Sequence, residues 1–113
     1  MSFAEWHRKR KAAFIRTDTD AYCYLLLVDA GTGQVTELFR GKIEANRPKI
    51  ISQGENGFRL GVYRGAKTVY ALVAAGKIDD FDEKLRVLKK EGSADIRSLF
   101  PQVSIRTFHF EHK

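Results

Sequence analysis

Apolar residues in the first sixteen positions recur at the spacing of an amphipathic helix. The residues that would share its apolar stripe are Phe3, Trp6, Ala13 and Phe14. Ser2 and Glu5 form the S-x-x-E pattern of a helix capping box, and the Thr and Asp residues at positions 17–20 favour a turn. The pattern therefore predicts an N-terminal helix that ends before residue 17.

Three stretches in the next part of the chain have the composition of β-strands. Residues 21–29 are apolar on both faces, which is typical of a central strand, and residues 35–43 are predicted to be its partner. Residues 49–53 and 58–63 flank Gly54-Glu55-Asn56-Gly57, which is a strong hairpin signature. Arg59 and Tyr63 would lie on the same face of the second hairpin strand.

A helix is predicted from Asp80 to Lys90, because Asp80 and Glu83 form a capping pair and Gly92 can end the helix. Its apolar stripe consists of Phe81, Leu85 and Leu88. The acidic residues of its first turn and the lysines of its last turn suit the helix dipole, which explains these charges without an active site. A second, short helix is predicted over residues 93–99, before Pro101.

Residues 67–75 combine β-branched and aromatic residues with alanines, so that both strand and helix remain open. We favour a strand paired with residues 58–63, and we expect a final strand over residues 102–110. The sequence thus predicts one α+β domain over residues 1–113, with an N-terminal helix, a mostly antiparallel sheet of four to six strands, and two helices before a final strand.

The composition narrows the class of protein. No apolar run approaches the ~18–20 residues that a membrane-spanning helix needs, and the basic N-terminal residues are not followed by the apolar core of a secretory signal. The single cysteine, Cys23, allows no internal disulfide. We therefore expect a protein of the cytoplasm with no membrane contact.

Positive charge gathers in two parts of a chain whose net charge is +6. Residues 1–16 hold five basic and one acidic side chain, and residues 40–67 hold seven basic and two acidic ones. Two basic blocks on an otherwise near-neutral chain suggest a surface that faces a polyanion. The alternative is a solubilising excess of lysine and arginine without a specific partner.

The segment Asp29-Ala30-Gly31-Thr32-Gly33 allows two interpretations. Locally it resembles the Asp-x-Gly-Thr loop of the sugar-kinase and actin family, over about five residues; that family has two large subdomains, for which this chain is too short. A strand ending in a carboxylate is also found in RNase-H-like folds. The simpler interpretation is a hairpin turn, in which Asp bonds the backbone and Gly takes a positive φ. We favour the turn, and we expect replacement of Asp29 to cost less stability than a core truncation.

Catalytic and metal-binding patterns are weak. An RNase-H-like metal-dependent nuclease would need Asp29, an acid such as Asp80, Asp82 or Glu83, and another such as Glu111 to converge on metal ions. His109 and His112 would lie on opposite faces of a strand, which disfavours a local zinc site. Cys23 fits a small buried hydrophobe better than a nucleophile. We therefore predict no enzyme, no catalytic residues, no metal and no cofactor.

Arg10 falls in the middle of the predicted apolar stripe of the N-terminal helix. It would either extend to solvent beside Trp6 or belong to a contact surface shared with that tryptophan. We predict a nucleic-acid-binding protein that uses the basic helix and the basic hairpin. The candidate contact residues are Trp6, Arg8, Lys9, Arg10, Lys11, Arg16, Arg59, Tyr63 and Lys67. The alternative is an inhibitor or adaptor module that binds an acidic protein.

Overall fold

The computed structural model describes residues 2–7, 12–29, 31–52, 65–91 and 96–112. These residues form mostly β-structure, with seven strands in two antiparallel sheets and two short helices. The predicted α+β fold built on one sheet is therefore wrong. Within these ranges no helix is long and apolar enough to cross a membrane.

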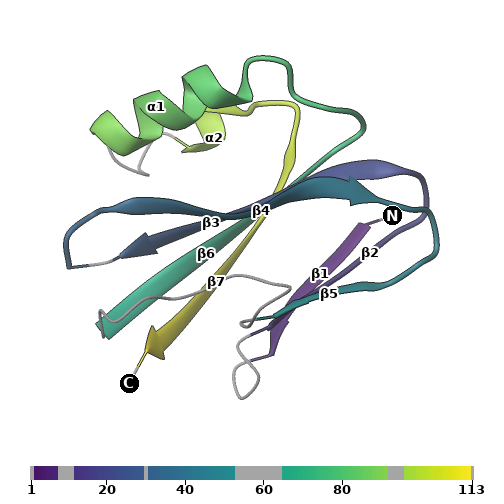
Figure 1. Ribbon diagram of the computed structural model, residues 1–113, viewed down its shortest axis with the longest axis horizontal. Coiled ribbons are helices and arrows are strands. Elements are labelled where there is room, and N and C mark those ends of the chain that lie inside the picture. The colour runs from purple at the N-terminus through teal and green to yellow at the C-terminus, as the bar shows by residue number, and fades with distance from the viewer. Residues whose placement is uncertain (1, 8–11, 30, 53–64, 92–95, 113) are drawn as a thin grey trace.

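The strands divide into a three-stranded sheet with the order β1-β2-β5 and a four-stranded sheet with the order β4-β3-β6-β7. The elements are β1 (Ser2–His7), β2 (Ala12–Thr17), β3 (Ala21–Asp29), β4 (Val35–Ile43), β5 (Lys49–Ser52), β6 (Gly65–Ala74), α1 (Phe81–Glu91), α2 (Ile96–Leu99) and β7 (Ser104–His112). The helices lie against one face of the four-stranded sheet, and the three-stranded sheet lies on the other side (Figure 1).

The predicted N-terminal helix is absent, and strands β1 and β2 pair there as an antiparallel hairpin. Ala4 and Trp6 belong to the core between the two sheets, together with Ala13 and Ile15 of the paired strand. These positions follow the two-residue period of a strand. The helical interpretation required Arg10 inside an apolar stripe, and the hairpin removes that conflict because Arg10 belongs to neither strand.

A long hairpin bent at one corner joins the two sheets. Ala21 pairs with Ile43 and Ile15 with Lys49, so the same register continues from the β3–β4 pair into the β2–β5 pair. At the corner, the backbone N–H of Asn46, which has a φ of 58°, donates to the carbonyl of Thr17 at 2.7 Å. This connection fixes how the three-stranded sheet sits against the four-stranded one.

Strand β3 is central in its sheet and apolar on both faces, as predicted. Its odd-numbered residues, such as Cys23 and Leu25, pack between the sheets, and its even-numbered residues, such as Tyr24 and Leu26, pack beneath the helices. Burial along β4 does not alternate strictly from residue to residue, and this irregularity has a physical cause. Leu25 pairs with Phe39 and Leu26 with Glu37, so the strand carries a one-residue bulge.

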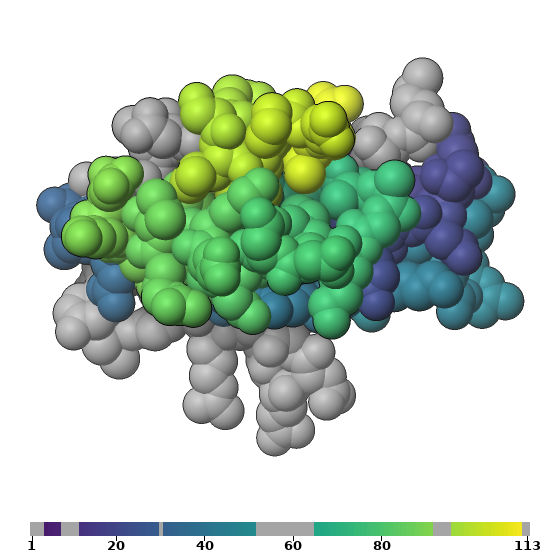
Figure 2. Space-filling view, turned by 90° about the horizontal axis from the view of Figure 1, so that it is seen from above, coloured from purple at the N-terminus to yellow at the C-terminus, as the bar shows by residue number. Residues whose placement is uncertain are grey.

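The helix predicted near residue 80 is confirmed as α1, and Phe81, Leu85 and Leu88 are buried against the sheet. Arg40 of β4 links the sheet to this helix. Its guanidinium lies 4.7 Å from the Phe81 ring centre and donates a hydrogen bond to Asp82 at 2.6 Å. Seen from the helix side, α1 and neighbouring segments cover much of this face, and the corner of the bent hairpin emerges at one end (Figure 2).

The remaining predictions have mixed outcomes. Residues 65–74 form a strand, as favoured, and α2 confirms a short second helix. Strand β6 is paired along both edges, by β3 and β7, so the predicted pairing of this strand with residues 58–63 is wrong. The predicted strand over residues 58–63 lies outside the described residues, as does the turn at 54–57.

Candidate functional site

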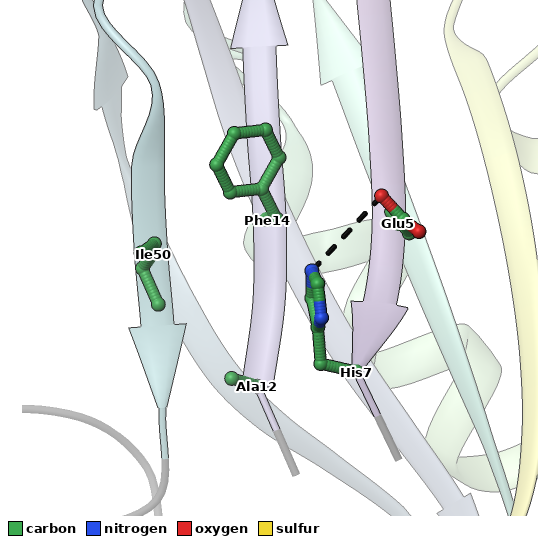
Figure 3. A pocket seen from close by; sticks show the side chains of 5 residues that line it. All are labelled: Glu5, His7, Ala12, Phe14 and Ile50. Atoms are coloured by element: carbon green, nitrogen blue, oxygen red, sulfur yellow. Dashed lines mark ion pairs between the residues drawn. The ribbon is translucent and has the colours of Figure 1, made fainter. Parts of the chain in front are cut away.

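The outer face of the three-stranded sheet carries a shallow hollow of about 280 Å³. It is lined by side chains from all three strands: Glu5, His7, Ala12, Phe14 and Ile50 (Figure 3). Phe14 pairs with Glu5 on one side and with Ile50 on the other, so these three side chains form one row across the sheet. The opposite face of the same strands packs into the core, and on this face His7 and Ile50 are exposed among the described residues.

The hollow combines an apolar floor with a polar rim. Ile50 is 58% exposed, which makes it the more exposed of the two large hydrophobic side chains at the surface of the described residues. The His7 ring meets Phe14 edge-on at 6.2 Å between centres. The Nε2 atom of His7 lies 4.0 Å from an oxygen of Glu5, and both side chains are about half exposed. The hollow thus places one carboxylate and one imidazole beside an apolar floor.

A second hollow adjoins the first and shares Ile50 with it. It has a volume of about 350 Å³ and is lined by Lys42, Glu44, Arg47, Pro48, Lys49 and Ile50. Arg47 pairs with Glu44 at 3.1 Å, and Lys42 pairs with Asp20 at 3.5 Å. The ammonium of Lys49 lies 5.0 Å from the Phe39 ring centre. Three cations line this hollow and two of them are paired with a carboxylate, so its net charge is positive.

Arg16 is the predicted contact residue that the structure places beside the hollow. It is exposed on β2, two residues beyond Phe14, so both side chains leave the same face of the strand. The predicted contact residues Arg8, Lys9, Arg10, Lys11, Arg59 and Tyr63 lie outside the described residues.

Trp6 and Lys67, two other predicted contact residues, are buried. Trp6 is 9% exposed and stacks on Phe110 of β7 with 4.9 Å between ring centres. Lys67 is 3% exposed and pairs with Asp29. Neither side chain lies on the surface described above, so we leave both out of the candidate site.

Positive charge is concentrated outside the described residues. These residues contain thirteen of the 20 basic and twelve of the 14 acidic side chains of the chain, so they are almost neutral. Residues 8–11 alone contribute four basic side chains. They connect His7 of β1 to Ala12 of β2, and both of these residues line the hollow.

The loop after β3 is a hairpin turn, as favoured from the sequence. One carboxylate oxygen of Asp29 accepts from the backbone N–H groups of Gly31 and Thr32 at 2.8 and 3.1 Å, and Gly33 has a φ of 75°. The other oxygen accepts from Lys67. The hydrogen bond from Lys67, followed by those from the backbone, holds the pKa of Asp29 below its ordinary value.

The carboxylates of the nuclease hypothesis do not converge in the described residues. Asp29 is engaged by Lys67 and by its own turn, whereas Asp82 binds Arg40 and Asp80 pairs with Lys84 on the helix side of the sheet. No group of three metal-binding side chains occurs among these residues. Burial raises the pKa of the Cys23 thiol to about 12, which keeps it protonated and unreactive at neutral pH.

The lining residues His7, Phe14 and Ile50 were missed from the sequence. The period-two alternation of Ala4 and Trp6 with Glu5 and His7 was a usable signal, because it places the last two on the opposite face from the core. The hollow itself depends on the register of three strands, which local sequence does not specify.

Comparison of the chain with known protein families, with curated proteins and with solved structures finds no match.

Proposed function

We propose that this protein is a non-enzymatic nucleic-acid-binding protein of the cytoplasm. The observation that carries the proposal is that His7 and Ala12, between which the sequence has four consecutive basic residues, both line the hollow on the outer face of the three-stranded sheet. A basic run in this part of the sequence would supply attraction to phosphates, and the partly aromatic surface would supply a contact for bases. The cytoplasmic location is supported by the single, buried and unpaired thiol of Cys23.

The neighbouring hollow supports the same proposal. Lys42, Arg47 and Lys49 line it next to Ile50, and Arg16 lies on the face that carries Phe14. Arg16 therefore flanks the apolar part of the surface along β2, and the cations of the neighbouring hollow lie near its edge at Ile50. Phosphate groups along a nucleic-acid strand would contact the cations while the intervening part of the strand crosses the hollow.

Binding of labelled mixed-sequence single-stranded DNA, duplex DNA and RNA across a salt series tests this function. We expect binding at ~50 mM salt that weakens linearly on a logarithmic scale as salt rises, because counterions are released on binding. Failure to bind any of these nucleic acids at ~50 mM salt would contradict the proposal.

An acidic protein is the second candidate partner. The observation that favours it is the 58% exposure of Ile50 next to cationic side chains, since apolar residues ringed by charge are common at protein interfaces. Such a partner would be indicated if nucleic acids failed to bind and if replacement of Ile50 by threonine left the free protein folded and equally soluble.

A further inference from the structure

We propose that the hollow on the outer face of the three-stranded sheet holds one unpaired base of a single strand, stacked on Phe14 with its amino edge toward Glu5. This inference rests on the proposed nucleic-acid-binding function and adds the form of nucleic acid and the kind of base that the surface selects. It follows from the chemistry of the lining residues and from their order across the sheet.

The first step concerns the shape of the hollow. At about 280 Å³ it lies just below the range of about 300–1,000 Å³ that is typical of small-molecule sites. A floor made by Phe14, Ala12 and Ile50 offers apolar contact to the face of a ring. Stacking on an aromatic side chain is the usual way in which proteins hold unpaired bases.

The second step concerns the polar rim. Glu5 lies opposite Phe14 on β1 and its carboxylate can only accept hydrogen bonds when ionised. A phosphate placed there would be repelled, whereas the exocyclic amino group of cytosine or adenine can donate to it. Thymine and uracil have a carbonyl at the corresponding position, so Glu5 selects against them.

The third step concerns the direction of the strand. Arg47 lines the neighbouring hollow, which shares Ile50 with this one, and Arg16 lies two residues along β2 from Phe14. Glu5 therefore marks the base side of the surface, and the cations mark the phosphate side. Within a duplex, both faces of a base are covered by the neighbouring bases of the stack, except at the duplex ends. The site therefore requires a single strand.

Fluorescence anisotropy with labelled oligodeoxycytidine, oligothymidine and a hairpin duplex of matched charge tests the inference. For the unchanged protein we expect the tightest binding to oligodeoxycytidine, weaker binding to oligothymidine and the weakest binding to the duplex. Phe14→Ala should weaken oligodeoxycytidine binding by about five- to hundred-fold, the range expected when one base–aromatic stack is removed. Phe14→Leu, which keeps apolar volume on the strand, should lose a similar amount of affinity.

Glu5→Ala is the second variant. Removal of a negative charge should strengthen binding of both single strands, while the preference for cytidine over thymidine disappears. Val87→Ala removes an exposed apolar side chain from α1, on the other side of the molecule, and should leave all affinities unchanged. Circular dichroism and thermal unfolding of each variant would establish that the fold persists.

The outcomes separate the inference from the function on which it rests. If the protein binds the duplex as tightly as single strands, and Phe14→Leu binds like the unchanged protein, the inference is overturned and nucleic-acid binding stands. Equal affinity for the two single strands would overturn the role of Glu5. If none of the three probes binds at low salt, both the inference and the proposed function fall.

Discussion

The ammonium group of Lys67 lies against the carboxylate of Asp29, on the face of β6 that also contributes Val69 to the core between the sheets. The lysine is 3% exposed and the aspartate 19%. The pair therefore closes one end of the apolar interior, at the point where β3 turns into β4. Lysine at this position neutralises a turn carboxylate from inside the molecule and does not face a partner.

The two members of this pair should respond unequally to substitution. Asp29→Asn leaves the buried ammonium without its charge partner, and it should destabilise the protein clearly, in contrast to the small effect expected from the sequence. Lys67→Met should cost less, because Asp29 keeps two backbone hydrogen bonds and some contact with water. Urea unfolding measures both. If both single variants had the same urea midpoint as the unchanged protein, the pair would not be stabilising. The double variant measures how strongly the two effects are coupled.

Stability should fall when the solution is acidified. The pKa values of Asp20, Asp29 and Asp82 lie below the ordinary value of 3.8 in the folded protein. The unfolded chain therefore takes up protons first, so the stabilisation is complete above that value and is lost as pH falls through the lowered pKa values. Unfolding midpoints should be nearly constant from about pH 7 to 5 and should drop below about pH 4. A flat profile down to about pH 2 would refute this assignment.

Trp6 reports on the contact between the two sheets. Because it is 9% exposed and stacks on Phe110, its fluorescence should be blue-shifted and protected from a soluble quencher. It is the only tryptophan, so the signal has a single source. Phe110→Ala should shift the emission to the red and lower the free energy of unfolding by roughly 3–5 kcal/mol. Emission typical of exposed indole in the unchanged protein would contradict the packing of β1 against β7.

Local sequence patterns were sufficient to predict those elements whose buried positions are set by residues close together in the sequence. Strand β3 is apolar on both faces because helices cover one side and the second sheet covers the other. Helix α1 begins directly after Asp80, as the capping pattern in the sequence predicts, and its regular buried stripe ends in Leu88. Both could be predicted because the deciding residues are neighbours in sequence.

The N-terminal region was misread because its deciding contacts are distant in sequence. Trp6 fits a helical stripe as well as an alternating strand, and its partner Phe110 lies near the other end of the chain. The helical interpretation also placed Phe14 on the same side as Trp6, whereas in strands the two side chains leave opposite faces. The hollow could not be predicted for that reason, although the misplaced Arg10 was a sign against the helix.

The packing of α1 can be tested by two neighbouring residues on its opposite faces. Leu88 is 1% exposed beneath the helix, and Val87 is 38% exposed on its outer side. Leu88→Ala should lower the free energy of unfolding by roughly 2–5 kcal/mol, because it opens a cavity. Val87→Ala should change it by less than about 0.5 kcal/mol. Similar losses of stability for the two variants in urea unfolding would show that the helix is rotated or undocked.

The measurement that most directly tests the account is the salt dependence of single-strand binding for a variant with alanine at positions 8, 9 and 11. These replace Arg8, Lys9 and Lys11, and the control variant replaces Lys77, Lys89 and Lys90, which are exposed on the helix side. We predict weaker binding for all sequences, and a slope of log affinity against log salt that is shallower by about 0.7 for each phosphate that the variant no longer neutralises. The control should keep the slope of the unchanged protein. Equal slopes for all three proteins would contradict a nucleic-acid surface at this end of the three-stranded sheet.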